Sequence, residues 1–388
     1  MKSIKFRFFD MVLCAAILSV GVQMTVSCED IQPEDGKSIY QGSFGGGNPV
    51  DLSSSASANC YIVSSAGNYS FRAVKGNSSV SVGAVACAVV LWESFGTSSS
   101  PSVGDLISSV SYEDGYIRFR TAETFKEGNA VIAAKDVEGN ILWSWHIWMT
   151  DVPEGQEYYN DAGVMMDRNL GATSSVPGDV GALGLFYQWG RKDPFLGSAS
   201  IYSGNVEAKS TVTWPSSVKS DSNTSTIEYV ISNPMTFICG NGGNDWTLAS
   251  MRPDALWTTS ETTKSIYDPC PVGWRVPDGG ENGVWSKAQG YLGGSYECPG
   301  IFDMNNRGVN FSVKFGYSQI IWYPTAGGRI YNGCIEGTGE YGCYLSASTT
   351  PVGSDLVGVY YFYFSKYNVT LWNNGYPADG GSVRCVQE

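Results

Sequence analysis

The chain has 388 residues, with 37 acidic against 24 basic side chains and a formal net charge of -13. A protein this acidic repels nucleic acid and anionic membrane surfaces, so we expect no nucleic-acid partner. Only 16% of its residues are charged, while 13% are aromatic and 47 are glycines. This composition is unlike that of a helical cytosolic enzyme and favours turn-rich β structure.

The first 27 residues have the three parts of a secretory signal peptide. Lys2, Lys5 and Arg7 form a charged start, residues 11–22 form an apolar stretch, and small and polar residues precede Cys28. The apolar stretch is shorter than the roughly 20 residues that a membrane-spanning helix requires, and no later segment is continuously apolar over that length. We therefore expect residues 1–27 to be removed and the mature protein not to be transmembrane.

The residues around Cys28 resemble a bacterial lipobox, in which the cysteine thiol receives diacylglycerol and becomes the new N-terminus. Thr25 stands where such motifs usually place leucine, so ordinary cleavage to a soluble product is the alternative. The acidic residues between 29 and 35 resemble the export tag of surface lipoproteins in the Bacteroides group, with a solvated linker as the alternative. We expect a lipid-anchored protein on the outer membrane of a Gram-negative bacterium, facing outward.

Residues 28–58 are rich in Gly and Ser, which is typical of a flexible tether. Residues 59–153 then hold short apolar or alternating runs about 8–12 residues apart. Asp114-Gly115 and Glu138-Gly139-Asn140 separate some of these runs with residues that tolerate the positive φ of hairpin turns. The pattern predicts an immunoglobulin-like β-sandwich. Its expected strands are 61–63, 69–74, 85–92, 107–112, 116–120, 131–135 and 141–149.

The strand expected at 141–149 carries the only histidine of the chain. Trp143 and Trp145 fall on one face of it, whereas Ser144 and His146 fall on the other, because side chains alternate along a strand. No nucleophile or carboxylate pattern surrounds the histidine, so a structural position on the more polar face is favoured over a catalytic role. With one histidine, no GxSxG string and no P-loop, the usual nucleophilic and nucleotide-binding templates do not fit.

The ten cysteines leave eight once Cys14 in the signal and Cys28 at the lipobox are set aside. An even number in a secreted chain is typical of a disulfide framework. Cys60 and Cys87 are the two that fall in the expected sandwich, where they could bridge its strands. None of the cysteines forms a CxxC pair, so we expect no metal and no cofactor.

Four strings in the rest of the chain carry a resemblance: MDRNLGA at 166–172, YQWGRKDPF at 187–195, YDPCPVGWRVP at 267–277 and SVRC at 382–385. In this order they resemble the Fibrobacter succinogenes major paralogous domain of fimbrillin-type surface lipoproteins, over residues 157–388. That family is similar in outline to C-type-lectin-like folds, including formylglycine-generating enzymes and retroelement-diversified variable proteins. The resemblance implies a C-type-lectin-like α+β domain with a small twisted sheet, two helices and long loops. The whole chain is then mainly β with minor α.

The resemblance also implies that Cys270 pairs with Cys385. Cys334 and Cys343 are close enough in sequence to bridge a local loop, which leaves Cys239 and Cys298 for each other by elimination. Neither the EPN or QPD and WND strings of calcium-dependent lectins nor the paired active-site cysteines of formylglycine-generating enzymes occur. Calcium-dependent sugar binding and that enzyme activity are therefore not carried over.

The segment 359–379 has two parts. The aromatic run 360–364 carries rings on both strand faces, so most of it is expected in the core. The residues after it mix Tyr and Trp with amides and charge, as recognition loops do, and the variable proteins place their binding surface in this region. Loop residues that merely cover the core are the alternative. The expected ligand-binding residues are Lys366, Tyr367, Thr370, Trp372, Asn373, Asn374, Tyr376 and Asp379.

Together these features predict a surface lipoprotein that binds an extracellular glycan or protein through loops of its C-terminal domain, in adhesion or as a fimbrial accessory or tip component. We do not expect an enzyme. One alternative is a carbohydrate-active enzyme or its binding module, because 37 acidic residues offer many candidate carboxylate pairs for glycoside hydrolysis. Another is a structural pilus subunit, whose partners would be other fimbrial subunits.

Overall fold

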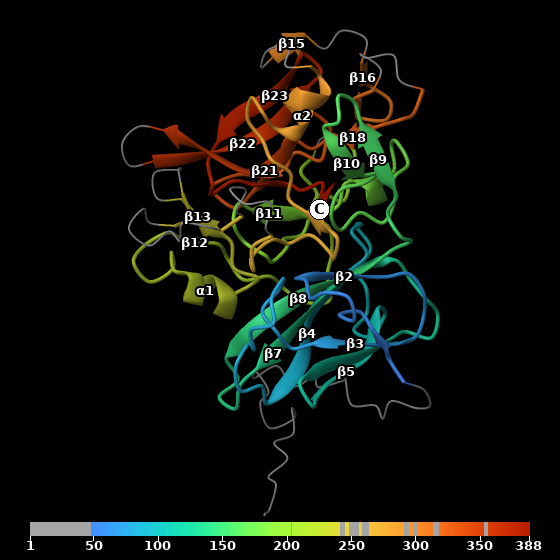
Figure 1. Ribbon diagram of the computed structural model, residues 1–388, viewed down its shortest axis with the longest axis vertical. Coiled ribbons are helices and arrows are strands. Elements are labelled where there is room, and N and C mark those ends of the chain that lie inside the picture. Colours follow the sequence, from blue (N-terminus) through green and yellow to red (C-terminus); the bar gives the residue numbers. More distant parts are fainter. Residues whose placement is uncertain are drawn as a thin grey trace, which may run out of the picture.

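The computed structural model describes residues 48–388 except 203, 241–244, 248–255, 258–263, 291–294, 298–300, 313–317 and 353–355. The fold is mainly β, with 39% strand and 5% helix, as the sequence predicts. The strands are distributed over several sheets in two parts of the molecule (Figure 1). The expected signal peptide and Cys28 lie outside the described residues. No helix in the described part is long and apolar enough to cross a membrane.

The N-terminal part consists of two four-stranded sheets that share one hydrophobic core. The first sheet has the order β1 (Val50–Asp51), β3 (Asn68–Arg72), β6 (Tyr116–Thr121) and β5 (Ile107–Glu113). The second has the order β2 (Cys60–Val63), β8 (Ile141–Met149), β7 (Gly128–Lys135) and β4 (Cys87–Ser94). Each strand that the sequence predicts here is present, with ends that differ by a few residues. Asp114 and Gly115 have the positive φ angles expected of a tight turn, 50° and 84°.

The end of the expected tether belongs to this sandwich, which corrects the boundary at residue 58. β1 pairs in parallel with β3, and Val50 lies opposite Tyr69 in the register. Ser53 and Ala58 are fully buried. Gly- and Ser-rich composition alone does not reveal such pairing, because the backbone supplies the hydrogen bonds of a strand whatever its side chains are.

The C-terminal part begins with the hairpin β9 (Gly155–Tyr158) and β10 (Gly163–Met166), which pairs with β25 (Val386–Gln387) at the other end of the chain. β14 (Trp274–Arg275) completes this sheet. Smaller units are the pair β12 (Val218–Lys219) and β13 (Ile238–Cys239), and the three-stranded sheet β16 (Phe302–Asp303), β17 (Gly308–Asn310) and β18 (Trp322–Pro324). This part also contains two short α-helices, α1 (Ile227–Ser232) and α2 (Val284–Ala288), and the 3-10 helix η2 (Val180–Ala182).

The largest sheet dominates the upper half of Figure 1. Its central strands are the long β21 (Tyr341–Val352) and β22 (Leu356–Ser365) followed by β23 (Asn368–Gly375). Beyond β23 lies β15 (Ser295–Glu297). On the other side of β21 the order continues with β24 (Gly380–Ser382), β19 (Gly328–Arg329) and β20 (Ile335–Glu336), and β11 (Phe186–Gln188) also pairs with β24.

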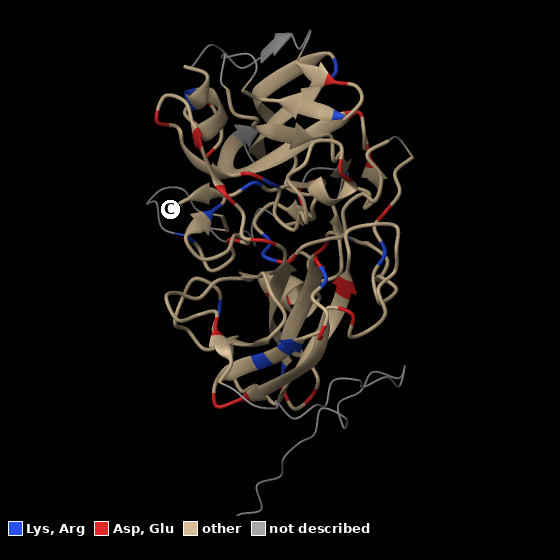
Figure 2. Ribbon diagram, turned by 90° about the vertical axis from the view of Figure 1, so that its right-hand side faces the viewer, with Lys and Arg blue, Asp and Glu red and all other residues tan. Residues whose placement is uncertain are grey.

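The two parts meet over a buried surface. One face of the sheet β2-β8-β7-β4 packs inside the sandwich, and its other face packs on the C-terminal part. Figure 2 shows segments that carry charged residues of both signs where the parts meet. The shared cluster joins Trp92, Val131 and Trp148 of the sandwich to Leu185, Tyr187 and Trp189 of the C-terminal part.

Cys270 and Cys385 form a disulfide, the pair that the resemblance implied. Two other expected bridges do not form, because Cys60, Cys334 and Cys343 are free thiols. Cys60 and Cys87 lie on the two outer strands of a four-stranded sheet. Three strand spacings of about 4.8 Å separate such strands by about 14 Å, well beyond the 7 Å between Cα atoms that a disulfide can span.

Cys343 lies in β21, and Cys334 immediately precedes β20. β24 and β19 lie between these two strands, so three strand spacings also separate β21 from β20. Closeness in sequence therefore does not bring these two thiols together. Cys239 is also a free thiol, and Cys298, its expected partner, lies outside the described residues.

Candidate functional site

The sheet β21-β22-β23 has a face lined by tyrosines. Cys343 in β21 lies opposite Tyr363 in β22, and Leu345 lies opposite Tyr361, so these four side chains share one face. Two residues before Cys343, Tyr341 falls on the same face, and its ring centroid is 5.6 Å from that of Tyr363. We call Tyr341, Tyr361 and Tyr363 the tyrosine face.

The opposite face of the same sheet is part of the core. Phe362 and Phe364 are fully buried there and pack with Trp285 of α2 and Tyr323 of β18. The expectation that most of the run 360–364 is core therefore holds for the phenylalanines. The two tyrosines that alternate with them, Tyr361 and Tyr363, are only partly buried.

Two adjoining pockets open on the tyrosine face and share Tyr341 and Tyr363 as a common wall. The first has a volume of about 180 Å³ and is lined also by Tyr361, Tyr376 and Asp379. We call it the Asp379 pocket. The second, of about 380 Å³, is lined by Lys366 and Tyr367 among others, and we call it the Lys366 pocket.

Asp379 is the acidic group of the first pocket. It lies at the end of a turn in which its backbone N–H donates to the carbonyl of Tyr376 (3.0 Å). Burial raises the pKa of its carboxyl to about 6, and a hydrogen bond from the backbone of Tyr331 opposes this shift. The Oδ1 atom is buried and accepts no hydrogen bond from the described residues.

Arg329 lines the same pocket but directs its guanidinium elsewhere. Its nitrogens donate to the carbonyls of Gly333 (2.8 Å) and Leu196 (3.1 Å) and pair with Glu207. In the described part of the chain, no basic side chain forms a salt bridge with Asp379.

The structure brings four of the eight expected ligand-binding residues to these pockets. Tyr376 and Asp379 line the first, and Lys366 and Tyr367 line the second. Tyr367 is 73% exposed at the turn between β22 and β23, with the ammonium of Lys366 4.8 Å from its ring centroid. These four residues belong to a strand turn and a loop, whereas the loop expected for the whole segment is interrupted by β23.

The other four residues lie on β23 and line neither pocket. Asn373 donates to the hydroxyl of Tyr361 (2.9 Å) and so holds that ring in place. Thr370 lies opposite Tyr363, and Asn374 is exposed near the end of the strand. Trp372 alternates with Asn373 and points to the other face, where it packs against the core and meets the ring of Tyr360 edge to face at 6.1 Å.

Sequence reasoning missed Tyr341, Tyr361 and Tyr363 as site residues, and it expected Cys343 in a disulfide, whereas the structure has it as a free thiol on this face. The signal for two of them was present, because the run 360–364 places tyrosines on one face of a strand and phenylalanines on the other. A face that carries hydroxyl-bearing rings is typical of partial exposure, whereas an all-phenylalanine face is typical of the core.

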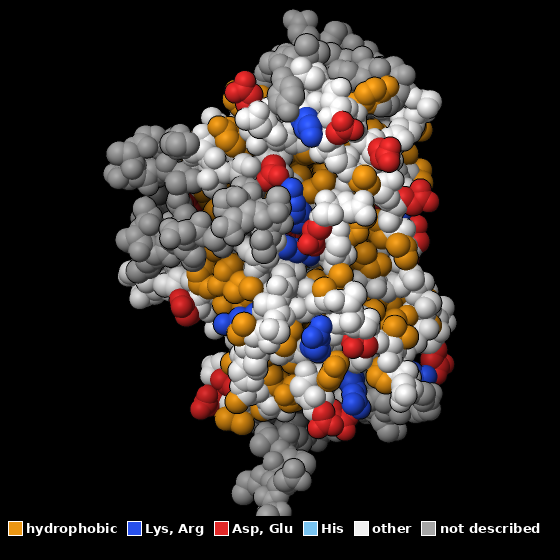
Figure 3. Space-filling model, in the orientation of Figure 1, with side chains coloured by type: hydrophobic (Ala, Val, Ile, Leu, Met, Phe, Trp, Pro, Cys, Tyr) orange, Lys and Arg blue, Asp and Glu red, His pale blue; other side chains and the backbone are white. Residues whose placement is uncertain are grey.

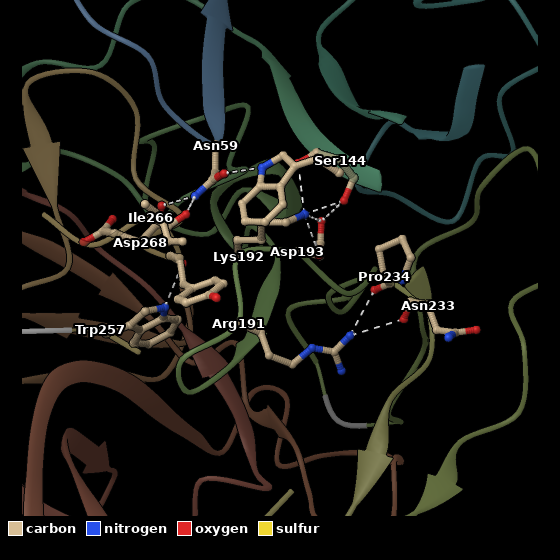
Figure 4. Close-up of polar contacts among 12 residues, drawn as sticks. Asn59, Ser144, Arg191, Lys192, Asp193, Asn233, Pro234, Trp257, Ile266 and Asp268 are labelled. Carbon is tan, nitrogen blue, oxygen red and sulfur yellow. Dashed lines mark hydrogen bonds and ion pairs between the residues drawn. The ribbon is translucent and has the colours of Figure 1, made fainter. Parts of the chain in front are cut away.

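Two of the strings that carry the resemblance reach the junction of the two parts, where Figure 4 shows Lys192 and Asp193 near Ser144, and Asp268 near Asn59. Lys192 is buried, and its ammonium contacts both carboxylate oxygens of Asp193 (2.8 and 2.9 Å) and the carbonyl of Ser144 in β8 (3.0 Å). The same ammonium lies 4.6 Å from the ring of Trp143. Burial lowers the pKa of this lysine, while the adjacent carboxylate of Asp193 opposes the shift.

Asn59 makes a second link across the junction. Its side-chain amide donates to the carbonyls of Ile266 (2.7 Å) and Asp268 (2.9 Å), and its oxygen accepts from the indole of Trp143 (3.0 Å). Asp268 in turn accepts from the backbone of Cys270 (2.8 Å). These contacts satisfy buried polar groups of the sandwich and of the C-terminal part. They indicate a structural junction and not an open binding site.

His146 lies in this junction too. It shares hydrogen bonds with Asn129 (2.9 Å) through one ring nitrogen and with Tyr187 and Cys60 (both 3.4 Å) through the other. Burial lowers the pKa of the imidazole to about 3. The expected polar face of β8 is therefore covered by the C-terminal part, and the histidine is neutral and enclosed.

Among the described residues, no group of three or more His, Cys, Asp and Glu side chains could hold a metal ion. Figure 3 shows acidic side chains scattered over one face of the molecule from end to end. No family model, curated protein or solved structure matches this chain.

Proposed function

We propose that this protein is a lipid-anchored surface protein of a Gram-negative bacterium that binds an extracellular glycan or protein on its tyrosine face. The observation that carries the proposal is the pair of adjoining pockets that share Tyr341 and Tyr363. Partly exposed rings next to amide and charged groups are the usual composition of recognition surfaces, because rigid rings give contact area at a low entropic cost.

The proposal includes an immunoglobulin-like sandwich that carries a C-type-lectin-like domain related to the Fibrobacter succinogenes major paralogous domain. Two facing four-stranded sheets and a disulfide that ties the chain end to Cys270 are consistent with it. The sandwich would act as a spacer, because the strands β21 and β22, whose residues line the pockets, lie at the opposite end of the molecule from β3 and β5 (Figure 1). Such an arrangement suits adhesion, or an accessory or tip position on a fimbria.

Binding can be tested with the mature chain on a glycan array and on immobilised extracellular proteins. We expect Tyr367→Ala and Tyr376→Ala to weaken binding of the recovered ligand by about 30-fold or more, because an aromatic anchor at an interface contributes about 2 kcal/mol or more. Both rings are well exposed, 73% and 45%, so the melting temperature should change little.

Two control variants accompany this experiment. Tyr159→Ala removes a 41% exposed tyrosine that lines neither pocket, and binding should be unchanged. Trp372→Ala should lower the melting temperature, because the indole packs on the core. It should leave the residues that line the two pockets in place, because Trp372 lines neither. Normal binding by both pocket variants would remove the tyrosine face as the binding surface.

Lipid anchoring depends on Cys28, which lies outside the described residues. Cells fed a fatty-acid analogue should label the wild-type chain and not the Cys28→Ser variant, which has no thiol to acylate. Membrane fractionation of the two strains provides the second readout. Equal labelling of both proteins would contradict the lipoprotein proposal and leave an ordinary secreted protein.

A further inference from the structure

We propose that the Asp379 pocket recognises an organic ammonium group, with the Asp379 carboxylate as its counter-charge and the surrounding tyrosine rings as its walls. This inference rests on the proposed function, since it assigns a ligand chemistry to one of the two pockets of the tyrosine face. The ammonium could belong to a lysine side chain of a protein ligand or to an amino sugar of a glycan.

The Asp379 carboxylate has an unsatisfied oxygen. Asp379 lines the pocket, and its Oδ1 atom is buried and accepts no hydrogen bond from the described residues. A carboxylate withdrawn from water is costly unless a hydrogen bond or a positive charge compensates for it. Here the backbone of Tyr331 supplies one partial compensation. A ligand that brings both a proton donor and a positive charge would supply the rest.

The other groups of the pocket lining leave the charge of this carboxylate unpaired. The titratable or charged side chains that line the pocket with it are Arg329, Tyr341, Cys343, Tyr361, Tyr363 and Tyr376. Arg329 is committed to Glu207 and to two carbonyls, as described above. Burial raises the pKa of the Cys343 thiol and of Tyr341 and Tyr361, and the charge of Asp379 adds to each shift. Because the charge of Arg329 is paired with Glu207, the Asp379 carboxylate is the charged group of the lining that no described side chain pairs with.

The size and lining of the pocket suit an ammonium group. Four tyrosines contribute to its wall, and the negative faces of aromatic rings attract cations. Gly375 lets the ring of Tyr361 lie close to the backbone, because a Cβ at that position would come within 2.5 Å of it. The volume of about 180 Å³ is smaller than a site for a drug-sized molecule and suits the end of a side chain or one sugar substituent.

The experiment uses matched probes with the mature chain. Nα-acetyl-lysine methylamide is compared with Nα-acetyl-norleucine methylamide, which has a similar stem and no ammonium, and methyl glucosaminide is compared with methyl glucoside. Binding is followed by ligand-observed NMR titration at pH 7.5. We expect an ammonium probe to bind at least tenfold more tightly than its neutral counterpart. The probe that binds more tightly identifies a peptide or a sugar as the source.

Asp379→Asn should reduce the affinity for that ammonium probe at least tenfold, because it removes the charge and keeps the size of the side chain. Lowering the pH to 5 should have the same effect on the wild type with the lysine probe, since the carboxyl takes up a proton as the pH falls through about 6 while the probe stays charged. The variant should show no loss of affinity between these two pH values.

The folded state of the variant is checked by melting at pH 8 and pH 4. A carboxyl whose pKa is raised by folding destabilises the protein above that pKa and not below its unfolded value. Asp379→Asn should therefore melt at a higher temperature than the wild type at pH 8, and this difference should nearly vanish at pH 4, close to the unfolded value of 3.8. A lower melting temperature at both pH values would show that Asp379 supports the fold and would overturn the assignment.

Equal binding of charged and neutral probes, or unchanged binding by Asp379→Asn, would also overturn the ammonium assignment. If Tyr367→Ala still loses the ligand from the array in that case, the tyrosine face stands as a binding surface and only its assigned chemistry fails. If the ammonium probes bind but neither tyrosine variant affects any array ligand, the pocket assignment stands and the proposed function fails.

Discussion

Replacing both Cys270 and Cys385 with alanine should lower the free energy of unfolding by about 4–5 kcal/mol, the chain-entropy value for a closed loop of this length. The bond joins residues 115 positions apart, so its loss frees a large part of the unfolded chain. It lies beside the pairing of β14 with β25, where Arg275 meets Val386. The C-terminal strand would then be held by short ladders alone, and its detachment would also free the edge of β10.

Chemical denaturation of the two proteins measures this effect, with the wild type also unfolded in the presence of a reductant. Cys334→Ala is the matched control, because it removes an exposed thiol that forms no disulfide, and its stability should equal that of the wild type. Reduced wild type and the double variant should agree. Equal free energies of unfolding for the oxidised and the reduced wild type would contradict this prediction, because they would mean that the disulfide does not stabilise the fold.

Asp193→Ala should destabilise the protein by about 3–5 kcal/mol, because it leaves the Lys192 ammonium buried without its counter-charge. Both side chains are almost fully buried, 3% exposed for Lys192 and 6% for Asp193. The hydroxyl of Ser144 also donates to Asp193, so the variant loses a link between β8 and the segment 190–194 as well. We expect the sandwich and the C-terminal part to loosen against each other, with new protease cleavage in the junction.

The double variant Lys192→Met, Asp193→Leu separates the loss of the pair from the loss of one partner. Replacing a buried ion pair with apolar residues of similar volume is often close to neutral, so this variant should recover most of the stability. Lys126→Ala is the surface control, since its pair with Asp105 is exposed and such pairs contribute about 0–1 kcal/mol. Destabilisation by Asp193→Ala no greater than that of Lys126→Ala would show that water reaches the buried pair.

The sequence predicted the local features well. Alternation along 141–149 assigned Trp143 and Trp145 to one strand face and Ser144 and His146 to the other, and the structure packs the two tryptophans in the sandwich core. Turn residues located the hairpin at Asp114, which has the positive φ expected there. These features depend on residues close in sequence, because the two-residue period of a strand and the φ preferences of turn residues are properties of the local chain.

The candidate site was predicted in part. Composition singled out the segment that contains Tyr367, Tyr376 and Asp379, which line the two pockets. It also singled out Trp372, whose ring packs on the core side. A register shift between Tyr361 and Tyr363 changes the alignment of β22 with β23, and composition carries no information about such a shift.

What the sequence by itself determined was therefore the β class, the sandwich strands and which side chains share a strand face. Only the tertiary structure decided what covers each face. The C-terminal part encloses His146, the strand order keeps Cys60 from Cys87, and the sheet places Tyr341 beside Tyr363 and near Asp379. These outcomes depend on contacts between residues far apart in the chain, and the period of a strand specifies a face without specifying its partner.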